Sequence, residues 1–100
     1  MGDYILMVQL DVPDEHVDEF NRLYDTEHLP HLLDVTGVIS GQRFELDRDG
    51  DDQLRFLIIY ELENPEIPAG EEWQEASKAP AWLEARKHLT ARRRGVFRKM

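Results

Sequence analysis

Apolar residues gather in short runs that charged and turn-forming residues separate. The run Tyr4–Val12 (YILMVQLDV) stops at Pro13, and its length and flanks predict a buried strand. Residues 54–62 (LRFLIIYEL) form the most apolar run and predict a central strand. Residues 38–47 (VISGQRFELD) mix polar and apolar positions, as an edge strand does. A turn of Asp and Gly at 47–52 joins these last two strands.

The pattern between the first two strands predicts a helix with one inward stripe. Pro13 and the acidic pair that follows it are typical of a helix start. Apolar and aromatic positions then recur every three or four residues. The stripe consists of Val17, Phe20, Tyr24, His28, His31 and Val35. Because a proline disfavours helical geometry in the preceding residue, we expect Pro30 to end or kink the helix near His28, with a short further turn at 31–34.

The second half of the chain predicts one more helix and a last strand. Residues 71–94 are helical by composition, and Pro80 splits them into two pieces. Gly95 ends the helix, and residues 96–100 form a brief closing strand.

The order strand, helix, strand, strand, helix, strand predicts a fold class. Two split β-α-β units make a ferredoxin-like α+β sandwich, a four-stranded antiparallel sheet with both helices on one face. We expect residues 1–100 to form a single domain. The face without helices would still be apolar in the central strand, where two sets of side chains alternate: Leu54, Phe56, Ile58 and Tyr60 with Arg55, Leu57, Ile59 and Glu61. An exposed apolar sheet face predicts a partner, so we expect a homodimer whose sheets pack face to face.

Composition and charge exclude several classes of protein. Of 100 residues, 41% are hydrophobic and 33% charged, which is typical of a soluble globular protein. The absence of cysteine excludes disulfide frameworks and thiolate sites. The net charge of −9 disfavours nucleic acid, no stretch predicts a membrane span, and the first residues show no signal-peptide pattern, so we expect a cytoplasmic protein.

The charge is unevenly distributed along the chain. All acidic residues lie within residues 1–84, whereas residues 85–100 hold seven Lys or Arg and no acid. This basic end has two interpretations: it grips an anion, or it neutralises the acidic body and stabilises the C-terminal end of a helix.

The inward stripe of the first helix is the best candidate site. Instead of purely apolar groups it carries the Tyr24 phenol and the imidazoles of His28 and His31. Burial of such groups costs free energy unless they form hydrogen bonds. It also shifts their pKa, which can suit them to act as general acids or bases. Asp25 lies three residues before His28 and could fix the imidazole tautomer. We expect catalytic roles for His28, Asp25 and Tyr24; the alternative is a satisfied structural histidine.

Three further residues are candidates for substrate binding, and two alternatives stay open. His31, Tyr60 and Trp73 are expected to line the pocket, although Trp73 and Trp82 could equally be core residues. His28 and His31 with a nearby carboxylate form a conceivable zinc or iron site, but this spacing arises often by chance. We therefore expect no metal and no cofactor. The chain has no glycine-rich phosphate loop and no G-x-S-x-G motif.

Residues 20–45 (FNRLYDTEHLPHLLDVTGVISGQRFE) resemble the signature of the dimeric α/β-barrel superfamily, in its EthD-like branch. An aromatic residue, an E-H-x-P segment and a Gly-Val turn carry the resemblance, and residues 57–66 and 78–100 resemble the later elements. The matching positions are Tyr24, Glu27, His28, Pro30, Gly37 and Val38. The resemblance implies a ferredoxin-like protomer, a dimeric α/β barrel formed through the sheets, and a pocket between sheet and helices. It also implies proton transfer that a histidine leads, which falls on His28 here.

The functional expectation follows from the stripe and the resemblance together. We expect a small cofactor-independent lyase, isomerase or cyclase that acts on an apolar, oxygen-bearing small molecule, such as an aromatic, lactone or polyketide-like metabolite. His28 would be the general base or acid. The alternatives are a non-catalytic metabolite-binding or accessory module and a cofactor-free monooxygenase.

Overall fold

One antiparallel sheet of four strands forms the base of the molecule. The computed structural model describes residues 2–48 and 51–100. The strands lie in the order β2-β3-β1-β4, so β1 and β3 are central, and β2 and β4 are the edges. Their bounds are β1 Tyr4–Asp11, β2 Val38–Glu45, β3 Phe56–Leu62 and β4 Ala91–Arg98. This topology confirms the predicted ferredoxin-like sandwich, with the edge and central strands in the expected places.

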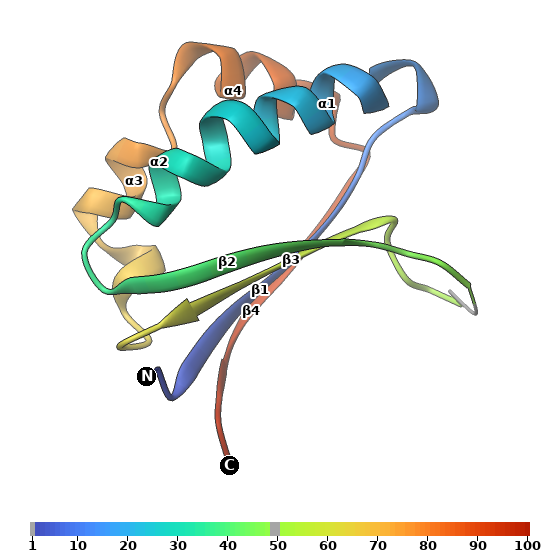
Figure 1. The fold of residues 1–100 in the computed structure, drawn as a ribbon. Helices are drawn as coiled ribbons and strands as arrows, with labels where there is room; N and C mark the ends of the chain where they lie inside the picture. Colours follow the sequence, from blue (N-terminus) through green and yellow to red (C-terminus); the bar gives the residue numbers. More distant parts are fainter. Residues whose placement is uncertain (1, 49–50) are drawn as a thin grey trace.

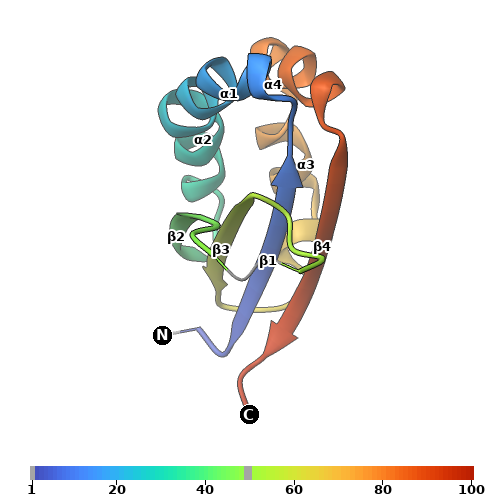
Figure 2. The same cartoon turned by 90° about the vertical axis from the view of Figure 1, so that its right-hand side faces the viewer.

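The helices cover one face of this sheet, as Figures 1 and 2 show. The first helical arm consists of η1 (Asp14–His16), α1 (Val17–Leu23), η2 (Tyr24–His28) and α2 (Leu29–Leu33). The second consists of η3 (Ile67–Ala69), α3 (Glu71–Ala76), α4 (Pro80–Ala85) and η4 (Arg86–His88). Within residues 2–48 and 51–100, no helix is both long enough and apolar enough to span a bilayer.

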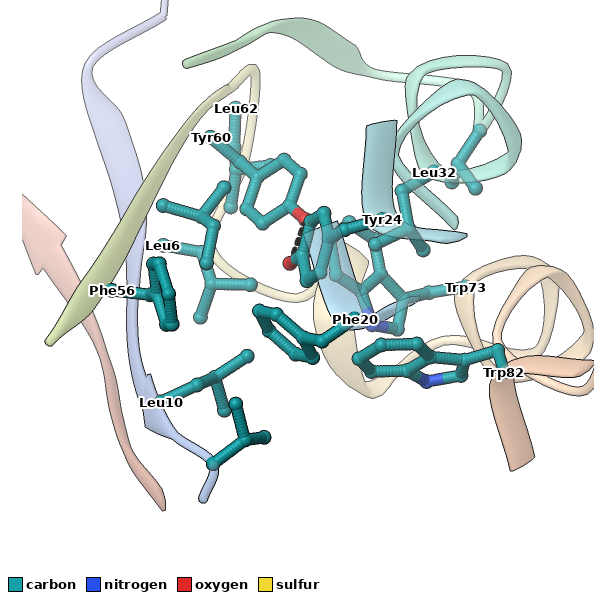
Figure 3. Close-up of a cluster of buried hydrophobic side chains, with 13 residues drawn as sticks. Leu6, Leu10, Phe20, Tyr24, Leu32, Phe56, Tyr60, Leu62, Trp73 and Trp82 are labelled. Carbon is teal, nitrogen blue, oxygen red and sulfur yellow. Dashed lines mark hydrogen bonds between the residues drawn. The ribbon is translucent and has the colours of Figure 1, made fainter. Parts of the chain in front are cut away.

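The core lies between the helices and the sheet because alternate strand residues point to this side. On β3, the residues Phe56, Ile58, Tyr60 and Leu62 are all buried, whereas the residues between them are only half-buried. Phe20 and the two tryptophans close the core from the helix side (Figure 3). Burial at every second residue is the period expected of a strand with one covered face.

The first helix does not end at Pro30, so that form of the prediction is wrong, and the irregularity near His28 is a turn of π-helix. Leu29 keeps helical dihedral angles (φ −60°, ψ −48°), and its N–H donates to the carbonyl of Tyr24, five residues back. Residues 24–28 thus form a turn of π-helix. Proline has no N–H to offer to the carbonyl of Thr26, and the wider turn before it accommodates the ring without ending the helix. The helix therefore continues to Leu33.

The last strand begins earlier than predicted. The second helical arm ends at His88, and residues 91–98 pair with β1 along its whole length. Arginine has a high helix propensity, and for this reason the sequence predicts a helix at residues 92–94. Pairing with β1 outweighs this local preference, and the basic run lies in β4 instead of at a helix end.

The turn predicted at 47–52 is only partly described. Residues 49 and 50 lie outside the described residues. Beyond them, Asp52 adopts a positive φ of 59°, a conformation that Asp tolerates in turns.

Gly37 connects α2 to β2 in a conformation that requires glycine. Its φ is +91°, and a Cβ built on it would collide with the side chain of Ile67. An L-residue in this region costs about 1–2 kcal/mol from the backbone alone.

We predict that Gly37→Ala lowers the free energy of unfolding by roughly 1–3 kcal/mol, because backbone strain and the collision with Ile67 add together. Urea denaturation measures this loss. Gly70→Ala is the matched control, since Gly70 has an ordinary φ of −80°. Equal losses in the two variants would contradict the explanation.

Candidate functional site

A cavity of about 320 Å³ lies between the sheet and the helices. Its wall includes residues from β1, β3, β4, the first helical arm and the second helical arm. The lining residues are Leu6, Val8, Leu10, Tyr24, His28, Leu32, Tyr60, Trp73, Gln74, Ser77, Trp82, Arg86, Leu89, Arg92 and Arg94. Ligand pockets in proteins usually have volumes of about 300–1,000 Å³, so this one suits a small molecule.

His28 points into this cavity, as the sequence predicts. Only 6% of the residue is exposed, and its ring stacks on Trp82 with centroids 3.8 Å apart and planes 13° from parallel. The Tyr24 ring meets it edge-on, with a centroid distance of 4.9 Å. Nδ1 is fully buried and has no hydrogen-bond partner among the described residues, so proton exchange with a ligand must use Nε2.

Burial dominates the acid–base state of His28. The apolar surroundings, and next the charges of His31 and Arg86, lower the pKa of His28 to about 3. At neutral pH the imidazole is uncharged and can accept a proton. A buried polar atom without a partner costs about 1–3 kcal/mol.

Tyr24 and Tyr60 form a hydroxyl pair at the floor of the cavity. Their oxygens lie 2.6 Å apart, and either hydroxyl can be the donor (Figure 3). Burial raises the pKa of Tyr24 to about 12 and raises that of Tyr60 as well, so both stay protonated at neutral pH. One hydroxyl proton serves the bond between them. The second hydroxyl proton is available to a ligand.

The π-helical turn sets which side chains reach the cavity. Tyr24, His28 and Leu32 are four residues apart and all line it. In a regular α-helix, such a spacing drifts by about 40° per step. The wider turn at 24–28 offsets this drift and keeps the three side chains on one face. π-turns are frequent at functional sites.

Asp25 does not orient His28, which corrects the predicted pairing. Its carboxylate is largely exposed and accepts a bond from Arg43 Nη1 at 2.7 Å. Arg43 also donates to Asn21, and its guanidinium carbon lies 4.8 Å from the centre of the Tyr24 ring. Asp25 therefore contacts the site only indirectly, by holding a cation against the back of Tyr24.

His31 faces solvent and does not line the cavity with His28. The prediction assumed regular spacing through Pro30, and the π-turn shifts the phase so that buried Leu32 takes the inward position. The two imidazoles therefore do not converge on one metal ion. Among residues 2–48 and 51–100, no group of three or more metal-ligating side chains comes together.

The two tryptophans and Tyr60 form aromatic walls. Trp73 is 5% exposed and meets the Tyr60 ring edge-on at 5.2 Å. Trp82 is 6% exposed and stacks on His28. Both tryptophans belong to the core and line the cavity at the same time, so the two interpretations of the sequence are compatible.

Three arginines in the cavity wall were not among the predicted site residues. They are Arg86 from η4, and Arg92 and Arg94 from β4. A strand reading of ARRRGVF would have shown that Arg92 and Arg94 share one face, since side chains alternate along a strand. The helical reading of the run obscured this signal.

Known structures share this architecture at low sequence identity. A candidate antibiotic biosynthesis monooxygenase from Deinococcus radiodurans is 15% identical, with a TM-score of 0.67 over 97% of this chain and 92% of that one. An EthD family protein from Bacillus halodurans is 14% identical, with a TM-score of 0.56 over 97% and 99%. A dimeric ferredoxin-like protein of unknown function from Thermobifida fusca is 12% identical, with a TM-score of 0.63 over 98% and 92%.

The chain has the ferredoxin-like fold of these proteins. Likeness at this identity shows the fold and leaves the reaction open. No protein-family model matches the sequence, and no curated protein is similar to it.

We predict that His28 makes the protein acid-sensitive. Unfolded histidine binds a proton near pH 6.5, whereas folded His28 does so only near pH 3, so stability is lost as the pH falls between these values. His28→Phe keeps a ring on Trp82 but cannot bind a proton. As the pH falls below 6, its free energy of unfolding should therefore decrease less than that of the wild type, by up to about 1.4 kcal/mol per pH unit.

Urea denaturation at pH 7.5, 5.5 and 4.5 measures this difference. His88→Gln is the control, because His88 is exposed and is not among the groups that lower the pKa of His28, so it should follow the wild type closely. Identical pH dependence in wild type and His28→Phe would show that the buried imidazole is not the cause.

Proposed function

We propose that this protein is a small cofactor-independent enzyme that moves a proton on an apolar, oxygen-bearing molecule held in the cavity. The observation that carries the proposal is the position of His28: a buried, uncharged imidazole in the same cavity as a protonated tyrosine pair. A base and a hydrogen-bond donor that line one cavity are what proton abstraction next to a carbonyl requires.

In this proposal each side chain has one role. His28 takes a proton from the carbon beside the substrate carbonyl through Nε2. The free hydroxyl proton of the Tyr24–Tyr60 pair donates to the carbonyl oxygen and stabilises the enolate that forms. Trp73 and Trp82 hold the apolar body of the substrate. Return of the proton to a different carbon completes an isomerisation. In a cyclisation, the enolate carbon instead attacks a second carbonyl of the same molecule, and the proton goes from His28 to the new alkoxide oxygen.

A pKa of about 3 makes the free imidazole a weak base, and the bound substrate offsets this weakness. The enolate is a negative charge in the same cavity, where charges interact far more strongly than in water. It stabilises the imidazolium that proton transfer creates. Basicity at His28 therefore rises during the reaction itself, and the resting enzyme avoids a buried cation.

Two alternatives use the same cavity. A cofactor-free monooxygenase begins with the same proton abstraction and then consumes O₂; the fold shared with a candidate antibiotic biosynthesis monooxygenase supports it. A metabolite-binding module would bind without any proton transfer. Oxygen consumption and proton exchange separate these three functions.

We predict that the protein exchanges the α-protons of 2-tetralone, an enolisable bicyclic ketone, for deuterium in D₂O. Proton NMR follows the exchange. His28→Ala should slow it by about 10²-fold or more, because general bases contribute at least this factor. His88→Ala is the matched control and should keep the wild-type rate, because His88 is exposed and does not line the cavity.

Two results would contradict the proposed function. One is full exchange by a folded His28→Ala variant, with circular dichroism as the check on folding. The other is wild-type protein that binds 2-tetralone and leaves its α-protons in place, which would favour the metabolite-binding module.

We also propose that two copies associate through the uncovered face of the sheet. The register places six large apolar side chains on this face: Ile5, Met7, Phe44, Leu57, Ile59 and Phe97. Phe44 and Phe97 are about half exposed, at 48% and 49%. A continuous apolar surface of this kind is typical of an interface.

We predict that the wild type elutes as a dimer, with twice the chain mass of 11.8 kDa by light scattering. The double variant Phe44→Glu, Phe97→Glu should be monomeric, because the association would bury two charges on each chain. Leu83→Glu is the control: Leu83 is similarly exposed but lies on α4, on the helix side. A monomeric wild type would refute the dimer.

A further inference from the structure

The alternation of β4 places two arginines on the helix side of the sheet, where both line the cavity and remain partly exposed to solvent. Arg92 pairs with Leu10 of β1, and Arg94 pairs with Val8, and both of these partners line the cavity. Arg93, between them, lies on the opposite face and donates to the main-chain carbonyl of Asp52. One edge of the cavity is thus built from two guanidinium groups.

A third cation comes from a different element. Arg86 belongs to η4, which follows α4, and it lines the same cavity. It is close enough to His28 for its charge to lower the pKa of that imidazole. Cations from a strand and from a helical segment therefore converge on the space beside the proposed base.

The charge of this wall is not balanced within the described residues. The cavity lining contains three arginines and no carboxylate. In residues 2–48 and 51–100, no Asp or Glu forms an ion pair with Arg86, Arg92 or Arg94, although Arg43 forms one ion pair and Arg55 forms two. Burial, and next the charge of Arg92, lower the pKa of Arg94. A bound anion would relieve this repulsion.

The rest of the lining also offers aromatic and aliphatic surface. Trp73 and Trp82 form apolar walls, and Leu6 and Val8 add aliphatic surface from β1. A simple anion would leave this surface uncovered. An anion that carries a ring would fill it, because the aromatic walls favour planar apolar groups. Arginine also matches a carboxylate with two parallel hydrogen bonds.

We propose that the cavity selects a small organic acid, with its carboxylate held by Arg86, Arg92 and Arg94 and its ring against Trp73 and Trp82. This inference deepens the proposed function and rests on it for the identity of the site. It narrows the substrate class from apolar oxygen-bearing molecules to aromatic or polyketide-like carboxylates.

The bound acid has a consequence for His28. A carboxylate beside Arg86 neutralises one of the charges that hold the imidazole unprotonated. The base is therefore stronger with an anionic ligand bound than with a neutral one. Charge recognition and proton transfer are coupled through one arginine.

The test compares two ligands with the same ring. Isothermal titration calorimetry at about 20 mM salt measures binding of 2-naphthoate and of its uncharged analogue 2-naphthamide. We expect 2-naphthoate to bind at least about 10-fold more tightly, because charge-assisted hydrogen bonds are worth more than one factor of ten. The preference should shrink at 1 M salt, since these arginines are partly open to solvent.

Matched variants show which arginines cause the preference for 2-naphthoate over 2-naphthamide. The double variant Arg92→Gln, Arg94→Gln should bring the ratio of the two affinities close to one. Arg93→Gln, Arg98→Gln removes the same charge from the same strand at positions that do not line the cavity, and should keep the preference. Arg86→Gln should also lower the ratio. Because Arg86 lies outside β4, this result could not be explained by misfolding of that strand.

Several results would overturn the inference. These are equal affinities for 2-naphthoate and 2-naphthamide, no binding of 2-naphthoate at millimolar concentration, or an unchanged ratio in both cavity variants. Displacement of 2-naphthoate by an equal concentration of inorganic phosphate would show an unspecific anion site. His28→Ala separates the two proposals: it should abolish exchange of 2-tetralone and keep the preference for 2-naphthoate.

Discussion

The hydrogen bond between Tyr24 and Tyr60 is the interaction on which the site depends. It joins the first helix to the central strand at 2.6 Å, within a core that is otherwise almost wholly apolar. Each hydroxyl alone would be a buried polar group without a partner, and together they meet this need with one proton left over. The bond therefore fixes the helix on the sheet and also supplies the donor that a ligand requires. Stability and chemistry use the same pair of atoms.

The π-turn follows from the same geometry. For Tyr24, His28 and Leu32 to lie on one face, the helix must turn more slowly than an α-helix does, and Pro30 removes one of the α-helical hydrogen bonds that would oppose this. His31 then rotates outward to solvent, and Asp25 reaches Arg43 instead of the imidazole. One local irregularity thus decides which ionisable groups enter the cavity and which stay outside it.

The sequence predicts the parts of this molecule that depend on local pattern. Strand order, the apolar alternation of β3 and the inward position of His28 all follow from periodicity and turn residues. Arg92 and Arg94 do not, because their side of the sheet depends on pairing between β1 and β4, which are about 80 residues apart in the chain. Local propensity favours a helix for three consecutive arginines, and only the long-range pairing reveals that two of them lie on the helix side of the sheet. The outward position of the His31 side chain does not follow from the sequence either, because a π-turn has no distinct sequence signal.

The net charge of the chain is negative, whereas the charged side chains that line the cavity are positive. This contrast narrows the class of ligands that the cavity can favour. A chain with a net charge of −9 repels anions at long range, and the repulsion grows with the charge of the ligand. The attraction from the three arginines acts inside the cavity, at distances shorter than the roughly 8–10 Å over which salt screens charges. A polyphosphate would meet the long-range repulsion several times over, whereas a molecule with one carboxylate meets it once and gains the full local attraction. The electrostatics of the whole chain therefore favour a singly charged organic acid over a nucleotide, as the size of the cavity and its aromatic walls do independently.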